Sequence, residues 1–194
     1  MKKLILAATI LALPALSHAA VFTDNFDGDT LALNQTTFLG GWTVSSGTVD
    51  LIGQPGFFEF FPGNGRYVDL DGSTRDAGLF DKQLALAAST QYILSFDLAG
   101  SQRADTNIVD VIFGTSSQTF TLASADPFAT YTMSFTTNAA ANYQISFQNS
   151  GTPGDNIGAL LDNVSVTAVP EPETYALMLA GLGLVGFAAR RKQV

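Results

Sequence analysis

Carboxylates are the main side chains with which the middle of this sequence could do acid, base or metal chemistry. The sequence has no cysteine, and its single histidine, His18, lies close to the N-terminus. Ser-His-Asp triads, cysteine nucleophiles and the usual histidine or cysteine sites for zinc, copper and iron are therefore excluded from the middle of the chain. What remains is the chemistry of facing carboxylates and of hard cations that prefer oxygen ligands.

The charge of residues 20–168 points in the same direction. This stretch holds fourteen aspartates and Glu59 against four basic residues, which gives a formal charge of −11. Such a field repels nucleic acid phosphates and anionic lipid surfaces, and it attracts cations. We therefore exclude nucleic acid as a partner. A pair of facing carboxylates, as in a glycoside hydrolase or lyase, stays an alternative, although no spacing in the sequence marks such a pair.

An aromatic pentapeptide, residues 57–61, is the most unusual segment of this stretch. As an extended strand it would place Phe57, Glu59 and Phe61 on one face, where aromatic rings beside a carboxylate could stack on a sugar ring or on a partner. The alternative is that both faces are covered, as phenylalanine usually is. Tyr67 is a further candidate for the same ligand site.

The N-terminus has the architecture of an export signal. Lys2 and Lys3 form a basic head, residues 4–16 form an apolar run, and Ser17-His18-Ala19 places small residues at the two positions that a signal peptidase requires. We expect residues 1–19 to be a helical signal peptide that signal peptidase removes, so that the mature chain begins at Ala20. An exported chain without cysteine has no disulfides, and core packing alone must stabilise it.

The C-terminus carries a second targeting pattern. Pro170-Glu171-Pro172 precedes an uncharged apolar run over residues 175–189, and Arg190, Arg191 and Lys192 follow this run. Basic residues that stay in the cytoplasm orient such a segment with its N-terminal side outside. As a helix the run is about 22 Å long, whereas the hydrocarbon core of a membrane is about 30 Å thick. This length favours a temporary transmembrane helix in the inner membrane over a permanent one.

These three features in this order resemble the PEP-CTERM sorting signal, a tail profile also named the ice-binding-protein C-terminal domain. The resemblance covers residues 169–194. It implies that an exosortase, a membrane cysteine transpeptidase, cleaves near Pro170-Glu171-Pro172 and passes the protein to the cell surface or the extracellular space. Such systems accompany exopolysaccharide production in Gram-negative bacteria. An ordinary C-terminal membrane anchor is the alternative.

The middle of the chain reads as β-strand almost throughout. Large apolar residues recur at every second position within residues 92–98, 109–113, 131–135 and 143–147, which indicates strands with one buried face. Further candidate strands cover residues 21–26, 42–45, 48–52, 57–61, 66–70 and 78–86. Roughly ten to eleven short strands without a helical period predict an all-β fold, a two-sheet antiparallel β-sandwich of the jelly-roll type, as one domain over residues 20–168.

Three short motifs resemble the galactose-binding-like jelly rolls that include many carbohydrate-binding modules. They are Asp24-Asn25-Phe26-Asp27, residues 64–72, and residues 160–166, which contain Asp162-Asn163-Val164. In those modules an acidic residue of the first strand and the aspartate of the last strand often share a structural calcium ion. The resemblance implies that Asp27 and Asp162 bind calcium, with Asp24 as a further ligand. The alternative is that these aspartates cap turns and strand edges through local hydrogen bonds.

Together these patterns predict an exported, exosortase-processed protein of the cell surface or extracellular matrix. Its sandwich would be non-catalytic, would bind carbohydrate and would stay associated with exopolysaccharide. Two alternatives remain open. One is a polysaccharide-active carboxylate enzyme, and the other is a purely structural adhesin or biofilm protein that binds other proteins through its sheet edges.

Overall fold

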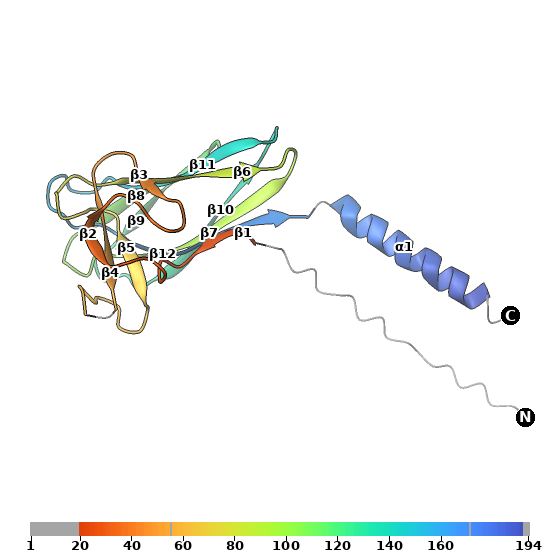
Figure 1. The fold of residues 1–194 in the computed structure, drawn as a ribbon, viewed down its shortest axis with the longest axis horizontal. Helices are drawn as coiled ribbons and strands as arrows, with labels where there is room; N and C mark the ends of the chain where they lie inside the picture. Colours follow the sequence, from red (N-terminus) through yellow and green to blue (C-terminus); the bar gives the residue numbers. More distant parts are fainter. Residues whose placement is uncertain (1–19, 55, 171, 192–194) are drawn as a thin grey trace, which may run out of the picture.

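The computed structural model describes residues 20–54, 56–170 and 172–191 (Figure 1). The predicted signal peptide, residues 1–19, lies outside this part of the chain, and so do Glu171 and Lys192 of the predicted sorting signal. Within the described residues the chain forms twelve strands followed by one helix. The all-β prediction for the middle of the chain is therefore confirmed.

The strands form two antiparallel sheets that pack face to face as a β-sandwich, as predicted from the sequence. The first sheet contains β1 (Ala20–Asp24), β2 (Ala32–Gln35), β4 (Val49–Gly53), β5 (Arg66–Asp69), β7 (Gln91–Ala99), β10 (Ala129–Thr136) and β12 (Leu160–Val169). The second contains β3 (Thr43–Val44), β6 (Leu79–Leu86), β8 (Asn107–Phe113), β9 (Ser116–Leu122) and β11 (Ala141–Asn149).

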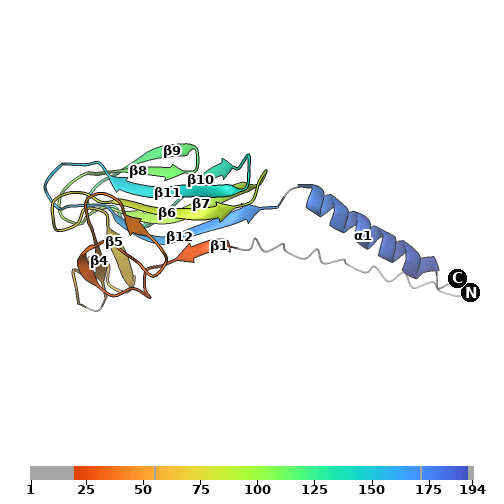
Figure 2. The same cartoon turned by 45° about the horizontal axis from the view of Figure 1, so that its top comes forward.

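The order of strands brings the two ends of the domain together. The seven-stranded sheet has the order β10-β7-β12-β5-β4-β2, with β1 paired to β12 beside this path, and the five-stranded sheet has the order β3-β6-β11-β8-β9. The first and last strands are therefore antiparallel neighbours. Figures 1 and 2 show them side by side at the end of the sandwich that faces the helix.

The core between the sheets follows from alternation along the strands. In β7 the buried residues Tyr92, Leu94, Phe96 and Leu98 alternate with partly exposed residues, as expected for a strand with one face in the core. Trp42, the single tryptophan of the sequence, is also a core residue. Its ring stacks on Phe80 at 4.6 Å between ring centroids with 13° between planes. Aromatic pairs of this kind add to the stabilisation from burial alone.

A second and smaller apolar cluster lies on the outer face of the seven-stranded sheet. Leu51 and Val68 belong to the core between the sheets, so their neighbours Ile52 and Tyr67 point to the opposite face. Residues 56–65, which precede β5, fold over this face. The members of the cluster are Ile52, Tyr67, Ala99 and Leu160, with Phe57, Phe60, Phe61 and Phe128 packed against them.

Three segments differ from the predicted strands. Residues 57–61 form no strand, because Phe58 adopts a left-handed φ of 51° that breaks the extended alternation, and only one isolated bridge joins Phe57 to Gly53. The strands β2 and β9 were not predicted. In β2 the pairing with β4 is irregular and Asn34 has a φ of 54°. In β9 only Phe120 and Leu122 are large apolar residues, which is too short an alternation to indicate a strand.

The helix α1 (Pro172–Arg191) follows the last strand and lies apart from the sandwich in Figures 1 and 2. Arg190 and Arg191 occupy its last turn, where the helix dipole favours positive charge. Within the part of the chain that the structure describes, no helix combines the length and the apolarity that a membrane crossing needs. The predicted transmembrane helix is therefore not confirmed. Both apolar clusters lie within residues 20–169, so the sandwich has its own complete core.

Candidate functional site

A pocket of about 290 Å³ opens on the outer face of the seven-stranded sheet, beside the phenylalanine-rich loop. Strands β4 and β5 supply its acidic and apolar floor, and four loops supply the remaining walls. The lining residues are Asp50, Ile52, Phe58, Phe60, Asp69, Ser73, Arg103 and Asn156. An apolar pocket with a few polar groups at its floor is the usual form of a ligand site.

One wall of the pocket is aromatic. The rings of Phe58 and Phe60 are stacked, with 6.4 Å between centroids and 22° between planes. Phe58 is 57% exposed, which is unusual for phenylalanine. On the other ring, Phe60, the guanidinium of Arg103 lies 5.4 Å from the ring centre. The positive charge therefore faces a ring from within the pocket, as in cation–π pairs. An exposed ring beside hydrogen-bond donors suits stacking on the apolar face of a sugar.

The floor of the pocket is ionic and is held by the protein's own groups. Nη2 of Arg103 lies 2.5 Å from Oδ2 of Asp69, and its Nη1 donates to the carbonyl of Asn156 at 2.9 Å. The amides of Asp71 and Gly158 donate to Oδ1 of Asp69, each at 3.1 Å. Burial raises the pKa of Asp69 to about 7, against the lowering effect of Arg103.

Asp50 lies opposite Asp69 across β4 and β5. Its Oδ1 accepts hydrogen bonds from the amides of Asn34 and Ser73, at 2.7 and 3.1 Å, and its Oδ2 accepts one from the Ser73 hydroxyl at 2.7 Å. Both carboxylates of this facing pair are thus engaged by protein donors.

The residues predicted to bind ligand lie mostly elsewhere. Tyr67 is fully buried, and its hydroxyl accepts hydrogen bonds from the amides of Phe60 and Phe61. Phe57 and Phe61 pack against the outer apolar cluster, and neither they nor Glu59 line the pocket. The other two rings of the segment, Phe58 and Phe60, line the pocket instead. The prediction rested on a period of two, which the left-handed φ of Phe58 breaks.

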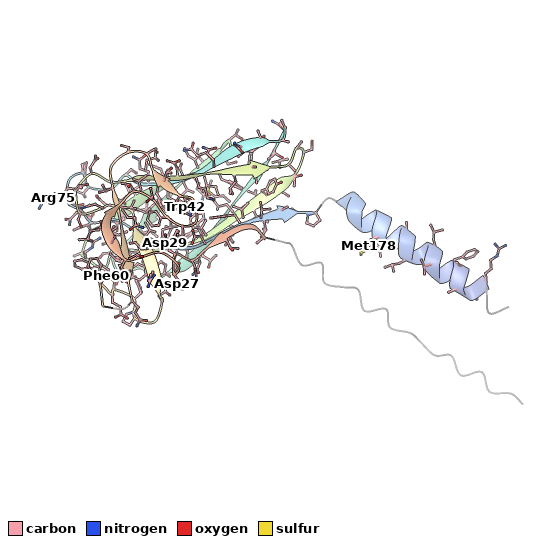
Figure 3. All side chains as sticks on the ribbon, in the orientation of Figure 1. Asp27, Asp29, Trp42, Phe60, Arg75 and Met178 are labelled. Atoms are coloured by element: carbon pink, nitrogen blue, oxygen red, sulfur yellow. The ribbon has the colours of Figure 1, made fainter. Side chains whose placement is uncertain are left out.

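Asp27 and Asp162 lie on either side of the segment that begins β5. The side-chain amide of Asn64 donates to Oδ2 of Asp162 at 3.0 Å, and the backbone amide of Arg66 donates to Oδ1 of Asp27 at 2.9 Å. Figure 3 shows Asp27 beside β5. Asp162 is 2% exposed and lies opposite Asp97 across β7 and β12.

The surroundings of Asp162 are electrostatically unfavourable for its charge. Burial, together with the nearby charges of Asp27, Asp97 and Asp24, raises its pKa to about 7. Among the described residues the single ion pair is the one between Arg103 and Asp69, so no basic side chain pairs with Asp162. A buried carboxylate among other acids is an environment that a bound cation would complete.

The predicted metal ligands are only partly suited to calcium. Asp27 and Asp162 offer oxygen donors of the type that calcium prefers. Asp24 is already engaged, because its Oδ1 accepts from the amide of Phe26 at 2.9 Å and its Oδ2 from the indole of Trp42 at 3.1 Å. Within residues 20–54, 56–170 and 172–191 no three acidic, histidine or cysteine side chains are grouped to hold a metal ion. A calcium site here would therefore need Asn or backbone oxygens beside two aspartates.

Two sequence families match the chain, and together they cover it from the first strand to the last helix. The family described as protein of unknown function (DUF642) matches residues 22–167. The PEP-CTERM protein-sorting motif matches residues 168–192, and it indicates an exported protein that an exosortase sorts. No curated protein sequence matches the chain.

Several solved structures share the sandwich. The CBM22-1 xylan-binding domain of Paenibacillus barcinonensis Xyn10C has a TM-score of 0.54 and 11% identity, over 80% of this chain and 97% of that chain. The CBM22-1-GH10 modules of Clostridium thermocellum Xyn10B in complex with xylohexaose give 0.51 and 13%, over 80% of this chain and 29% of that chain. A Stig cyclase, Fisc, from Fischerella sp. TAU gives 0.52 and 17%, over 79% of this chain and 99% of that chain. At these identities the likeness shows the fold alone, which this chain shares with carbohydrate-binding modules and with a Stig cyclase.

Proposed function

The chain belongs to the DUF642 family, and on this premise we propose that its sandwich binds carbohydrate without catalysing a reaction. After export and sorting by an exosortase, the protein would act at the cell surface or in the extracellular matrix, associated with exopolysaccharide. Its negative charge suits this location, because an acidic surface stays soluble and avoids non-specific binding to anionic membranes. The fold shared with xylan-binding modules supports the choice of ligand class.

The exposed ring of Phe58 is the observation that carries this proposal. It stands at the mouth of the pocket, beside Phe60 and above the Arg103–Asp69 pair. A sugar could stack on the ring while its hydroxyls reach the polar floor. Each part of this arrangement is held by the protein before a ligand arrives, which reduces the entropy cost of binding.

The engagement of the acids supports a binding role over a catalytic one. Asp50 and Asp69 each accept three hydrogen bonds from the protein. A glycoside hydrolase needs one carboxylate free to attack or activate water and another free to deliver a proton. For this reason we prefer a non-catalytic module to the polysaccharide-active enzyme.

Affinity electrophoresis tests the proposal. The sandwich domain, residues 20–169, is run through gels that contain xylan or a bacterial exopolysaccharide, with calcium or with chelator. We expect retardation of the parent and weaker retardation of Phe58→Ala. Leu39→Ala serves as the control, because Leu39 is also an exposed apolar residue but does not line this pocket. Equal mobility with and without every polysaccharide would refute carbohydrate binding.

One edge of the five-stranded sheet favours a second candidate, a structural adhesin. The strand β9 lies at this edge and pairs only with β8 within its sheet. It contains no charged residue, although charges and prolines are the usual protection of exposed edges. Self-association of the domain in sedimentation, abolished by Gln118→Lys, would support this candidate.

A further inference from the structure

A second cavity is lined by two residues that each have a buried side-chain oxygen without a hydrogen-bond partner. The cavity, of about 200 Å³, lies between the β5–β6 loop and the β11–β12 loop, and Asp71 and Asn149 both line it. Asp71 is 2% exposed and Asn149 is 4% exposed. Within the described part of the chain, Oδ1 of each residue is buried and accepts no hydrogen bond.

The two residues bring these acceptors to the wall of one cavity from distant parts of the sequence. A buried acceptor without a partner costs about 1–3 kcal/mol, and more when it is charged. Native structures therefore contain few such atoms, and two beside one cavity indicate a missing partner. That partner must donate hydrogen bonds or carry positive charge. Asp76 and Ser150 line the cavity as well and add further oxygen atoms.

The charges around Asp71 favour a cation as this partner. Burial and the neighbouring acids Asp155, Asp50 and Asp76 raise the pKa of Asp71 to about 6. Arg103 is the nearby basic group, but it is already bonded to Asp69 and to the carbonyl of Asn156.

Arg75 is the basic residue that lines the cavity itself, yet it does not neutralise Asp71. The residue is exposed, and it forms no ion pair with any residue that the structure describes. Figure 3 shows Arg75 on the outside of this end of the sandwich. The compensation of Asp71 by the protein is therefore limited to Arg103, which lowers the pKa of Asp71 only in part and does not line the cavity.

We propose that this cavity is a binding site for a hard divalent cation of the calcium type, with Asp71 and the side-chain oxygen of Asn149 as ligands. Asp76 and backbone carbonyls of residues 150–154 would complete an all-oxygen shell of the kind that calcium prefers. The site is separate from Asp27 and Asp162, and it does not depend on carbohydrate binding. The ion would tie the β5–β6 loop to the β11–β12 loop, which also carries Asn156 of the aromatic pocket.

The small number of acidic ligands sets the expected affinity. No group of three acidic, histidine or cysteine side chains is placed for metal binding in the described residues. Calcium affinity falls with the number of ligand charges, and extracellular modules bind with dissociation constants of about 10⁻⁴–10⁻³ M. We expect a dissociation constant in this range, so that calcium would occupy the site at extracellular concentrations but not at cytoplasmic ones.

Calcium titration by calorimetry tests the site in the sandwich domain. All proteins carry Asp162→Asn, so that the cluster around Asp162 does not contribute. Asp71→Asn removes the charged ligand and keeps the side-chain shape, whereas Asn149→Asp adds a charge to the same cavity. Glu59→Gln is the matched control, because it removes one negative charge and Glu59 forms no hydrogen bond or ion pair with a described residue.

We expect calcium to bind at least about tenfold more weakly to Asp71→Asn and more tightly to Asn149→Asp, with Glu59→Gln unchanged. The proposal is overturned if Asp71→Asn and Glu59→Gln bind equally, or if about 10 mM calcium produces no binding. If sodium at matched ionic strength gave the same calorimetric signal as calcium, the signal would come from general charge screening, and the proposal would be overturned. If Asp71→Asn does not fold, the calcium affinity of Asn149→Asp tests the proposal. An affinity equal to that of the parent would mean that the cavity holds only water.

Discussion

The guanidinium Nη2 of Arg103 lies 2.5 Å from Oδ2 of Asp69, a carboxylate that is 2% exposed. This is the single ion pair among the residues that the structure describes. It joins the loop after β7 to the last residue of β5 and forms the floor of the aromatic pocket. Because the pair is largely buried, each partner depends on the other for the compensation of its charge.

Removal of the guanidinium should therefore destabilise the domain. Arg103→Met keeps an apolar stem but leaves Asp69 buried without its partner, and breaking a buried pair costs about 3–5 kcal/mol. Since Arg103 is 25% exposed, we expect a loss of about 2–3 kcal/mol in urea unfolding. The double variant Arg103→Met with Asp69→Asn should recover part of this loss. An unchanged unfolding midpoint for Arg103→Met would contradict the structural role of the pair.

The pKa of Asp162 gives the domain an unusual pH dependence. In the folded state it is raised from 3.8 to about 7, so between these values the folded protein holds a proton that the unfolded chain has released. The folded state therefore binds more protons, and stability falls as the pH rises through this window. We expect urea midpoints in chelator to decrease from pH 4 to pH 8, with a flatter profile for Asp162→Asn. Identical profiles for the two proteins would show that Asp162 does not titrate in this way.

Calcium should offset the loss of stability that ionised Asp162 causes, if Asp27 and Asp162 hold an ion between the first and last strands. At a hundredfold excess over its dissociation constant, calcium would stabilise the domain by about 2.7 kcal/mol. Magnesium should substitute poorly, because it demands a smaller and nearly octahedral shell. The melting temperature is measured in calcium, magnesium and chelator for Asp71→Asn, which removes the other candidate site, with and without Asp162→Ala. A full calcium response in the double variant would exclude Asp162 as a ligand.

The phenylalanines of the β4–β5 loop should separate into two classes. Phe61 packs against Phe128 at 4.8 Å between centroids and against Tyr67 at 6.2 Å. Its replacement by alanine should cost about 2 kcal/mol of unfolding free energy, less than at a fully buried site. Phe58→Ala should cost little stability because the ring is 57% exposed, while it weakens polysaccharide binding. Chemical unfolding and affinity electrophoresis of the two variants test this division. A loss of stability in Phe58→Ala without one in Phe61→Ala would contradict it.

The strands of the sandwich were predictable because their signal is local. A period of two in β7 and β8 follows from the geometry of one strand, and it needs no knowledge of the partner strand. The sorting signal was predictable for the same reason, since its three features adjoin one another in the chain. The missed strand β2 and the predicted strand over residues 57–61 are places where a left-handed φ interrupts that local rule. The strand β9 was missed because only its last residues alternate between apolar and polar.

By itself, the sequence determined the class of the protein: an acidic, cysteine-free, exported β-sandwich in which histidine and cysteine chemistry is excluded. Only the tertiary structure decided which acids are free and which are engaged. It bound Asp24 to Trp42, paired Asp69 with Arg103, and brought Asp71 and Asn149 to one cavity from the ends of different strands. Composition and periodicity record what a residue is and which way its strand alternates. The partner that it meets depends on strand order and loop conformation, which pack residues far apart in the chain against one another.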